Sequence, residues 1–193
     1  AFEYCGLEEI EIPDSVIHIG YQAFANCSSL KTVLLPDNGI YIGEEAFIGT
    51  ACYNDESNWD NKVLYVDNHC LDADESISGK LEIREGTRAV SNNAFDYCSS
   101  LTEVVIPDSA SFIGQSAFES CSNLTKITIP DGVTRIGAYA FRYCAALKEI
   151  SIPGSVETIE DGTFYSCGSL SKATIGNGVS GISEDAFRTC DSL

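Results

Sequence analysis

The sequence repeats itself with a period of 23 residues, and this repeat constrains the fold more than any other feature. The phrase Ala-Phe-x-x-Cys-x-x-Leu-x-x-Ile-x-Ile-Pro-x-x-Val-x-x-Ile-Gly returns along the chain. Its phenylalanines are Phe2, Phe24, Phe47, Phe95, Phe118, Phe141, Phe164 and Phe187. A repeat of this length is typical of a solenoid, in which each coil packs only against its neighbours. We therefore expect an elongated stack of coils.

The residues of one repeat predict what each part of a coil does. In the coil at 117–139, Phe118, Cys121 and Leu124 are spaced three apart. This spacing places them on one face of a short α-helical or 3₁₀ turn. Polar and apolar residues then alternate, as in a half-buried strand, and Pro130 ends the strand. The fold class that we predict is an α/β repeat solenoid, with one helical turn and one short strand per coil. Strands of successive coils should pair in parallel and in register.

This coil resembles the BspA-type leucine-rich repeat of bacterial and protist surface proteins. The resemblance rests on the Ala-Phe-x-x-Cys head and the Ile-Pro-x-x-Val-x-x-Ile-Gly tail, which recur together outside residues ~50–80. It implies a right-handed leucine-rich-repeat arc and a secreted or cell-surface location. It also implies adhesion, or recognition of a protein or glycan of a host or neighbouring cell. It implies no catalytic residues and no cofactor.

One segment departs from the repeat. In a regular coil the last strand residue follows the phenylalanine by 11 positions, whereas Ile83 follows Phe47 by 36. About 25 residues are therefore inserted, and the register resumes after them. We predict a single solenoid over residues 1–193, with regular coils at 1–49 and 81–193 and an irregular insert at about 50–80.

The insert contains the first candidate partner-binding residues. Residues 62–66 and 69–73 are rich in strand formers and flank a turn, which predicts a β-hairpin that projects from the solenoid edge. A polar loop before it carries Tyr53 and the only tryptophan, Trp59. Exposed aromatic side chains on loops are favoured interface anchors, so Tyr53, Trp59 and Tyr65 are candidates. The alternative for Trp59 is that its ring packs onto the solenoid and tethers the insert.

The outward side chains of the strands form the second candidate surface, because solenoids commonly bind partners on such a face. The surface is polar and has no aromatic stripe that would stack on sugars. Its charges alternate in sign from coil to coil, which favours a cross-strand ladder worth roughly a few tenths of a kcal/mol per pair. The candidate residues here are Glu103, Lys126, Thr128, Glu149 and Lys172.

Seven of the nine cysteines occupy one repeat position and should form a column with one thiol per coil. Neighbouring Cβ atoms would be ~4.8 Å apart, wider than the ~3.8 Å of a disulfide. We therefore expect buried free thiols, and no metal site, because thiols in a line do not converge. A bridge between Cys52 and Cys70, which lie outside the column, stays open as an alternative. The column contains Cys5, Cys27, Cys98, Cys121, Cys144, Cys167 and Cys190.

The charge of the chain restricts its partners. With 29 acidic and 11 basic residues, the formal net charge is −18, which argues against nucleic acid and anionic membrane surfaces. The acidity indicates either a solvated exterior or a face for cationic partners or Ca²⁺, although no calcium-loop motif is present. No stretch approaches the ~20 apolar residues of a membrane span. We expect no membrane insertion within this chain.

No motif indicates an enzyme. The chain has two histidines, and it contains no G-x-S-x-G, P-loop or dinucleotide-binding sequence. Our interpretation is a non-catalytic extracellular recognition module of an adhesin-like surface protein. The alternative is a structural spacer arm that displays another domain. Because the chain has no methionine and begins and stops inside a repeat, we interpret it as a piece of a longer polypeptide.

Overall fold

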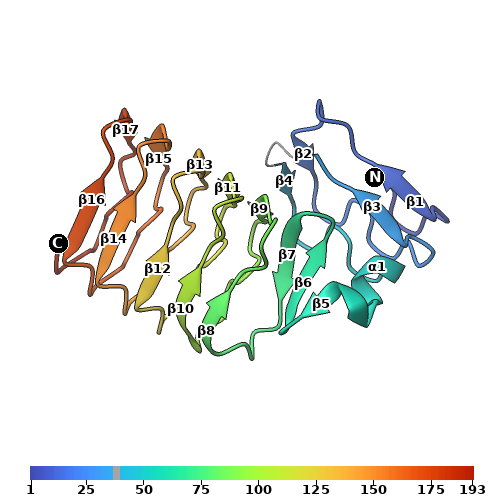
Figure 1. The fold of residues 1–193 in the computed structure, drawn as a ribbon, viewed down its shortest axis with the longest axis horizontal. Helices are drawn as coiled ribbons and strands as arrows, with labels where there is room; N and C mark the ends of the chain where they lie inside the picture. Colours follow the sequence, from blue (N-terminus) through green and yellow to red (C-terminus); the bar gives the residue numbers. More distant parts are fainter. Residues whose placement is uncertain (37–39) are drawn as a thin grey trace.

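The computed structural model describes residues 1–36 and 40–193. The chain winds into a solenoid whose coils place their strands in two rows (Figure 1). The first row holds the longer strands: β1 (Glu9–Glu11), β3 (Thr32–Leu34), β8 (Gly79–Glu82), β10 (Leu101–Val105), β12 (Lys126–Thr128), β14 (Glu149–Ile152) and β16 (Lys172–Ile175). The second row holds two-residue strands: β2 (His18–Ile19), β4 (Tyr41–Ile42), β9 (Ala89–Val90), β11 (Phe112–Ile113), β13 (Arg135–Ile136), β15 (Thr158–Ile159) and β17 (Gly181–Ile182).

The strands of the regular coils pair as the sequence predicts. In these parallel pairs, facing residues are 23 positions apart, as with Glu9 and Thr32 in the first row and Thr158 and Gly181 in the second. The exception is a register shift at the start of β8, where Gly79 faces Leu101. Parallel, in-register pairing is therefore confirmed. The second row was not expected as strands; it forms where the Val-x-x-Ile part of the repeat returns to the core.

The predicted helical turn in each coil is wrong. The described part of the chain has only two helical segments, α1 (Ala51–Asn54) and the 3₁₀ helix η1 (Glu56–Asn58), and both lie in the insert. Around the recurring phenylalanine, residues two positions before and two after it adopt φ between 52° and 71°. A helix needs consecutive right-handed residues, so these left-handed positions prevent one. They are Gln22, Glu45, Asn93, Ser116, Tyr139 and Gly162 before it, and Tyr4, Asn26, Gly49, Tyr97, Ser120, Tyr143, Ser166 and Thr189 after it.

The left-handed residues turn backbone groups toward the next coil. The N–H groups of the phenylalanine and of the residues two before and two after it donate to carbonyl oxygens of the following coil. Between the coils of Phe95 and Phe118, these three bonds measure 3.0, 2.8 and 2.9 Å. We call this set of bonds the turn ladder. It satisfies backbone groups that a helix would have paired internally.

Two side-chain columns run through the stack. The phenylalanine rings of adjacent regular coils lie nearly parallel, with centroids 5.1–5.5 Å apart. All nine cysteines are free thiols. Along the cysteine column, thiols donate to the phenylalanine carbonyl of the previous coil, for example Cys144 Sγ to Phe118 O at 3.2 Å and Cys167 Sγ to Phe141 O at 3.1 Å. The recurring phenylalanine and cysteine thus fill the core, and the cysteine thiol also gives the phenylalanine carbonyl a hydrogen-bond donor.

The insert forms the predicted hairpin, but it does not project. Strands β5 (Trp59–Asp60), β6 (Val63–Val66) and β7 (His69–Ala73) form an antiparallel meander, and β7 pairs in parallel with β9. All four residues of β6 are buried. Val63 and Tyr65 belong to the core of the C-terminal coils, whereas Leu64 and Val66 belong to the core of the N-terminal coils. The hairpin is therefore a wedge between two arms of the solenoid (Figure 1).

Contacts at the tip of the hairpin connect both arms. The Leu35 N–H donates to Asp67 Oδ2 at 3.0 Å, and the Arg84 guanidinium donates to the Asp67 carbonyl oxygen at 2.9 Å. Arg84 also lies over the Tyr65 ring, 4.3 Å from its centroid, and its N–H donates to the Tyr65 hydroxyl. Arg84 stands where the repeat has proline, which has no N–H to donate. Because Arg84 replaces proline here, its N–H can hold the Tyr65 hydroxyl of the hairpin.

Candidate functional site

The outward strand face is polar and exposed. Lys126, Thr128, Glu149 and Lys172 are exposed, and Glu103 is half-buried. Lys126 and Glu103 face each other in register and form an ion pair of 3.0 Å. Glu149 and Lys172 also face each other in register, without an ion pair between them among the described residues. The five candidates therefore lie along neighbouring strands β10, β12, β14 and β16.

The three aromatic candidates of the insert are not displayed as expected. Tyr65 is only 3% exposed, so its ring lies in the core under Arg84 and is withdrawn as a partner-binding candidate. Trp59 packs against the N-terminal core and donates Nε1–H to the Tyr53 carbonyl oxygen at 2.8 Å. The rings of Tyr53 and Trp59 meet edge to face at 5.6 Å. Trp59 therefore packs inward, as the alternative expects, and its role as a tether of the insert stays a prediction.

The cysteines outside the column do not form a bridge. Cys52 lies in the N-terminal core with its thiol 3.1 Å from Thr50 Oγ1. Cys70 lies in the core of the C-terminal coils. The two are free thiols that belong to different cores.

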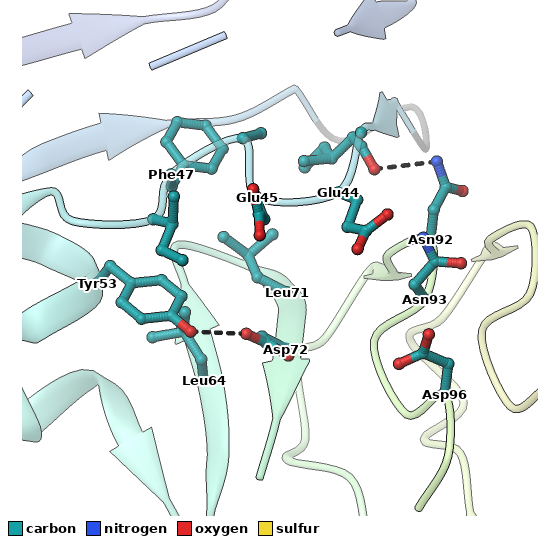
Figure 2. Close-up of a pocket in the computed structure, with 14 residues that line it drawn as sticks. Glu44, Glu45, Phe47, Tyr53, Leu64, Leu71, Asp72, Asn92, Asn93 and Asp96 are labelled. Atoms are coloured by element: carbon teal, nitrogen blue, oxygen red, sulfur yellow. Dashed lines mark hydrogen bonds between the residues drawn. The ribbon is translucent and has the colours of Figure 1, made fainter. Parts of the chain in front are cut away.

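A pocket of about 220 Å³ opens where the two arms meet the insert (Figure 2). One wall is residues 42–48 of the N-terminal arm, and the opposite wall comes from Asn92, Asn93 and Asp96. Strands β6 and β7 contribute Leu64 and Leu71 between these walls. The pocket combines an apolar part with polar walls, as ligand-binding sites do.

The pocket occupies the place of a missing layer of the turn ladder. The N–H groups of Glu45, Phe47 and Gly49 correspond to the donors of the other coils, but they form no hydrogen bond within the described residues. The carbonyl oxygens that would accept in the next coil, those of Asn92, Ala94 and Asp96, accept none there either. Through β7 the insert extends the second strand row of the C-terminal arm, and the turn ladder stays open at this junction within the described residues.

Four carboxylates line this pocket, and its other lining residues are neutral. They are Glu44, Glu45, Asp72 and Asp96. In Figure 2 the carboxyl groups of Glu44 and Asp96 are directed toward the same space between the walls. Burial, followed by the nearby charges of Glu44 and Asp72, raises the pKa of Asp96 to about 6. Such a shift indicates that negative charge is poorly compensated there.

Asp72 is held by neutral donors. The Tyr53 hydroxyl donates to Asp72 Oδ2 at 2.8 Å, and the Ala73 N–H donates to Oδ1 at 2.8 Å. Burial raises the pKa of Asp72, although these two hydrogen bonds act in the opposite direction. Burial also raises the pKa of Tyr53, and the Asp72 charge adds to the rise. A cation that entered the pocket would relieve the cost of this buried negative charge.

The repeat pattern does not predict this pocket. One signal was available: Phe47 and Phe95 are separated by 48 positions, two more than two whole repeats. That mismatch predicts a disturbed junction between the two arms. The sequence does not indicate which carboxylates the junction brings together, because they come from three separate segments, at residues 44–45, 72 and 96.

The geometry defines a class of protein: a leucine-rich-repeat solenoid with stacked parallel strands, exposed outward strand residues and a buried wedge. The model of the BspA type leucine rich repeat region matches residues 1–79 and 74–193, in six copies. The chain therefore belongs to the BspA-type leucine-rich repeat family. No curated protein matches its sequence. No helix in the described residues is long and apolar enough to cross a membrane.

Solved structures share the fold. A leucine rich cell surface protein from Faecalibacterium prausnitzii is 29% identical, with a TM-score of 0.71, over 97% of this chain and 58% of its own. The leucine rich repeat protein of T. pallidum is 28% identical, with a TM-score of 0.58, over 96% of this chain and 78% of its own. The pneumococcal vaccine antigen PcpA, 20% identical with a TM-score of 0.62 over 95% of this chain and 56% of its own, supports the fold alone.

Proposed function

We propose that this chain is a non-catalytic recognition module of a secreted or cell-surface protein, and that it binds a protein or glycan of a host or neighbouring cell. The strongest support for this function comes from the outward face of the strands. There, side chains such as Lys126, Thr128 and Glu149 are exposed in adjacent coils and take no part in the core. A rigid surface of this kind can change its outward residues without changing the fold.

The cell-surface protein of F. prausnitzii supports the location, because it shares the fold over 97% of this chain. This chain spans 58% of that protein. The role of the complete protein is therefore part of the same proposal. A spacer arm that binds nothing is the competing function, and the experiment below separates the two.

The test is a binding screen of the purified chain against host matrix proteins, mucins and a glycan array. Retention of a partner, with binding weakened by Lys126→Glu, would support recognition by the strand face. The change should not unfold the protein, because the exposed Lys126–Glu103 pair is worth at most about 1 kcal/mol. Lys31→Glu is the matched control, since Lys31 is exposed and precedes β3 rather than lying on the strand face. Failure to retain any partner would favour the spacer arm.

A further inference from the structure

The turn ladder is open at the junction between the coils of Phe47 and Phe95. At every other junction between successive regular coils, backbone N–H groups around the phenylalanine donate to the next coil. At this junction, which includes the pocket, the donors of Glu45, Phe47 and Gly49 and the acceptors of Asn92, Ala94 and Asp96 form none of these bonds within the described residues. An added peptide segment has carbonyl oxygens for the donors of one wall and N–H groups for the acceptors of the other, and main-chain hydrogen bonds of this kind give affinity in peptide recognition.

The size of the pocket restricts what can enter. Its volume is about 220 Å³, below the roughly 300–1,000 Å³ of sites that enclose a small molecule. A single long side chain with its own stretch of backbone fits this description better. The apolar part, formed by Phe47, Leu64 and Leu71, suits a hydrocarbon stem.

The charge of the pocket restricts the end of that side chain. Glu44, Asp72 and Asp96 come from three different segments, and no basic residue is among the described residues that line the pocket. Glu45 already accepts from Gln22 Nε2 at 2.6 Å and from the Tyr21 hydroxyl at 3.1 Å, both of which are neutral donors. The charges of Glu45 and Asp72 are thus hydrogen-bonded to neutral donors but not neutralised. A lysine has both the stem and the compact cationic head that this combination requires.

We propose that the pocket binds a lysine side chain of an extended segment of a partner protein, and that the segment's backbone pairs with the open turn ladder between Phe47 and Phe95. This proposal deepens the recognition function and rests on it, by adding a site and a ligand chemistry away from the strand face. If a partner binds only to the strand face, the recognition function is supported and the proposal of this lysine site is overturned.

The first test uses the peptide acetyl-Gly-Ala-Lys-Ala-Gly-amide and measures binding by isothermal titration calorimetry. A matched peptide with norleucine in place of lysine keeps the stem and loses the charge. Cadaverine keeps the stem and the charge and has no peptide backbone. We expect saturable binding of the lysine peptide and at least about tenfold weaker binding of the other two. Equal binding of the norleucine peptide, or no binding of the lysine peptide at millimolar concentration, would overturn the proposal. Equal binding of cadaverine would overturn the role of the backbone.

The second test uses the protein itself. The double variant Glu44→Gln with Asp96→Asn should weaken lysine-peptide binding at least about tenfold, because it keeps the side-chain shapes and removes two charges. Glu157→Gln, on an exposed position of a distant coil, should leave binding unchanged. Amide hydrogen exchange at Phe47 and Gly49 should slow when the peptide binds. Unchanged exchange at these amides, or equal binding by the double variant and the control, would overturn the site even if a strand-face partner is still retained.

Discussion

Asn92 and Ile42 are 50 positions apart in the sequence, yet the Asn92 side chain donates Nδ2–H to the Ile42 carbonyl oxygen at 2.9 Å (Figure 2). Its Oδ1 accepts from the Gln115 N–H at 2.8 Å. One buried amide thus connects the end of β4 in the N-terminal arm with two coils of the C-terminal arm. It replaces, across the wedge, part of the contact that adjacent coils make elsewhere through their backbones.

Asn92→Ala should loosen this connection. The change leaves a buried carbonyl oxygen and an N–H without partners, so we expect the free energy of unfolding to fall by about 1–3 kcal/mol. The measurement is urea denaturation, with amide exchange at Gln115 as a local report. Asn123→Ala is the control, because the exposed Asn123 amide also donates to a carbonyl of the previous coil, at 2.8 Å, and water can replace that bond. Equal midpoints for the two variants would contradict the role assigned to Asn92.

Gly137→Ala should destabilise the stack by crowding two coils. A Cβ atom at Gly137 would lie 2.5 Å from the Gln115 nitrogen, so the neighbouring backbone would have to move. We expect a loss of about 1–3 kcal/mol. At Gly168, where nothing lies within 4 Å of an added Cβ, alanine should be neutral or stabilise the protein by up to about 1 kcal/mol. Thermal melting checks both expectations: the melting temperature should fall for the Gly137 variant and stay equal or rise for the Gly168 variant.

Protonation of Asp96 should stabilise the fold. Its pKa is raised from 3.8 to about 6 in the folded protein, so the folded state binds the proton more tightly than the unfolded state. The resulting stabilisation is complete below pH 3.8 and is lost as the pH rises through 6. Because Asp96 is partly exposed, we expect an effect on the order of 1 kcal/mol. The melting temperature should therefore rise between pH 7 and pH 5.

Asp96→Asn should reduce that rise, since it removes the titrating group while keeping its shape. Glu157→Gln is the control, because it removes one charge from a distant exposed position. It measures how much stability comes from reducing the overall repulsion in a chain of net charge −18. Identical pH profiles for Asp96→Asn and Glu157→Gln would contradict the assignment to the pocket.

The cysteine column should be poorly reactive in the folded state. Burial raises the pKa of Cys98 to about 12 and also raises the pKa of Cys144, and the thiolate is the reactive form. Both should react with maleimide more slowly than Cys5 and Cys190, which are only half-buried, by roughly two orders of magnitude. Timed labelling followed by peptide mapping checks the order. Early labelling of Cys144 would show that the coils separate easily.

The repeat predicts the coil well because each recurring apolar position has one physical role. Phe118, Cys121 and Leu124 are fully buried on one face, as their spacing indicates. The helix expected there does not form, since residues such as Ser116 and Ser120 are left-handed. Neither is glycine, so composition alone does not reveal the positive φ. What favours it is the next coil, which supplies the acceptors of the turn ladder.

The insert was harder to predict than the coils. The four consecutive buried residues of β6 follow the pattern of a strand covered on both faces, and this signal was available in the apolar run from Val63 to Val66. The pocket depends instead on how two arms meet, which is decided by contacts as distant as that between Asn92 and Ile42. A single sequence carries little information about such contacts.

Strand β6 is less free to change than the coils of either arm. Successive residues, Leu64 and Tyr65, face different cores, so a substitution in this strand affects the packing of both arms at once. A whole 23-residue unit could be duplicated or lost within either arm without altering the neighbours of β6. Growth of such a chain by complete repeats is therefore compatible with the junction, and the wedge with its acidic pocket would keep its structure while the arms around it change in length.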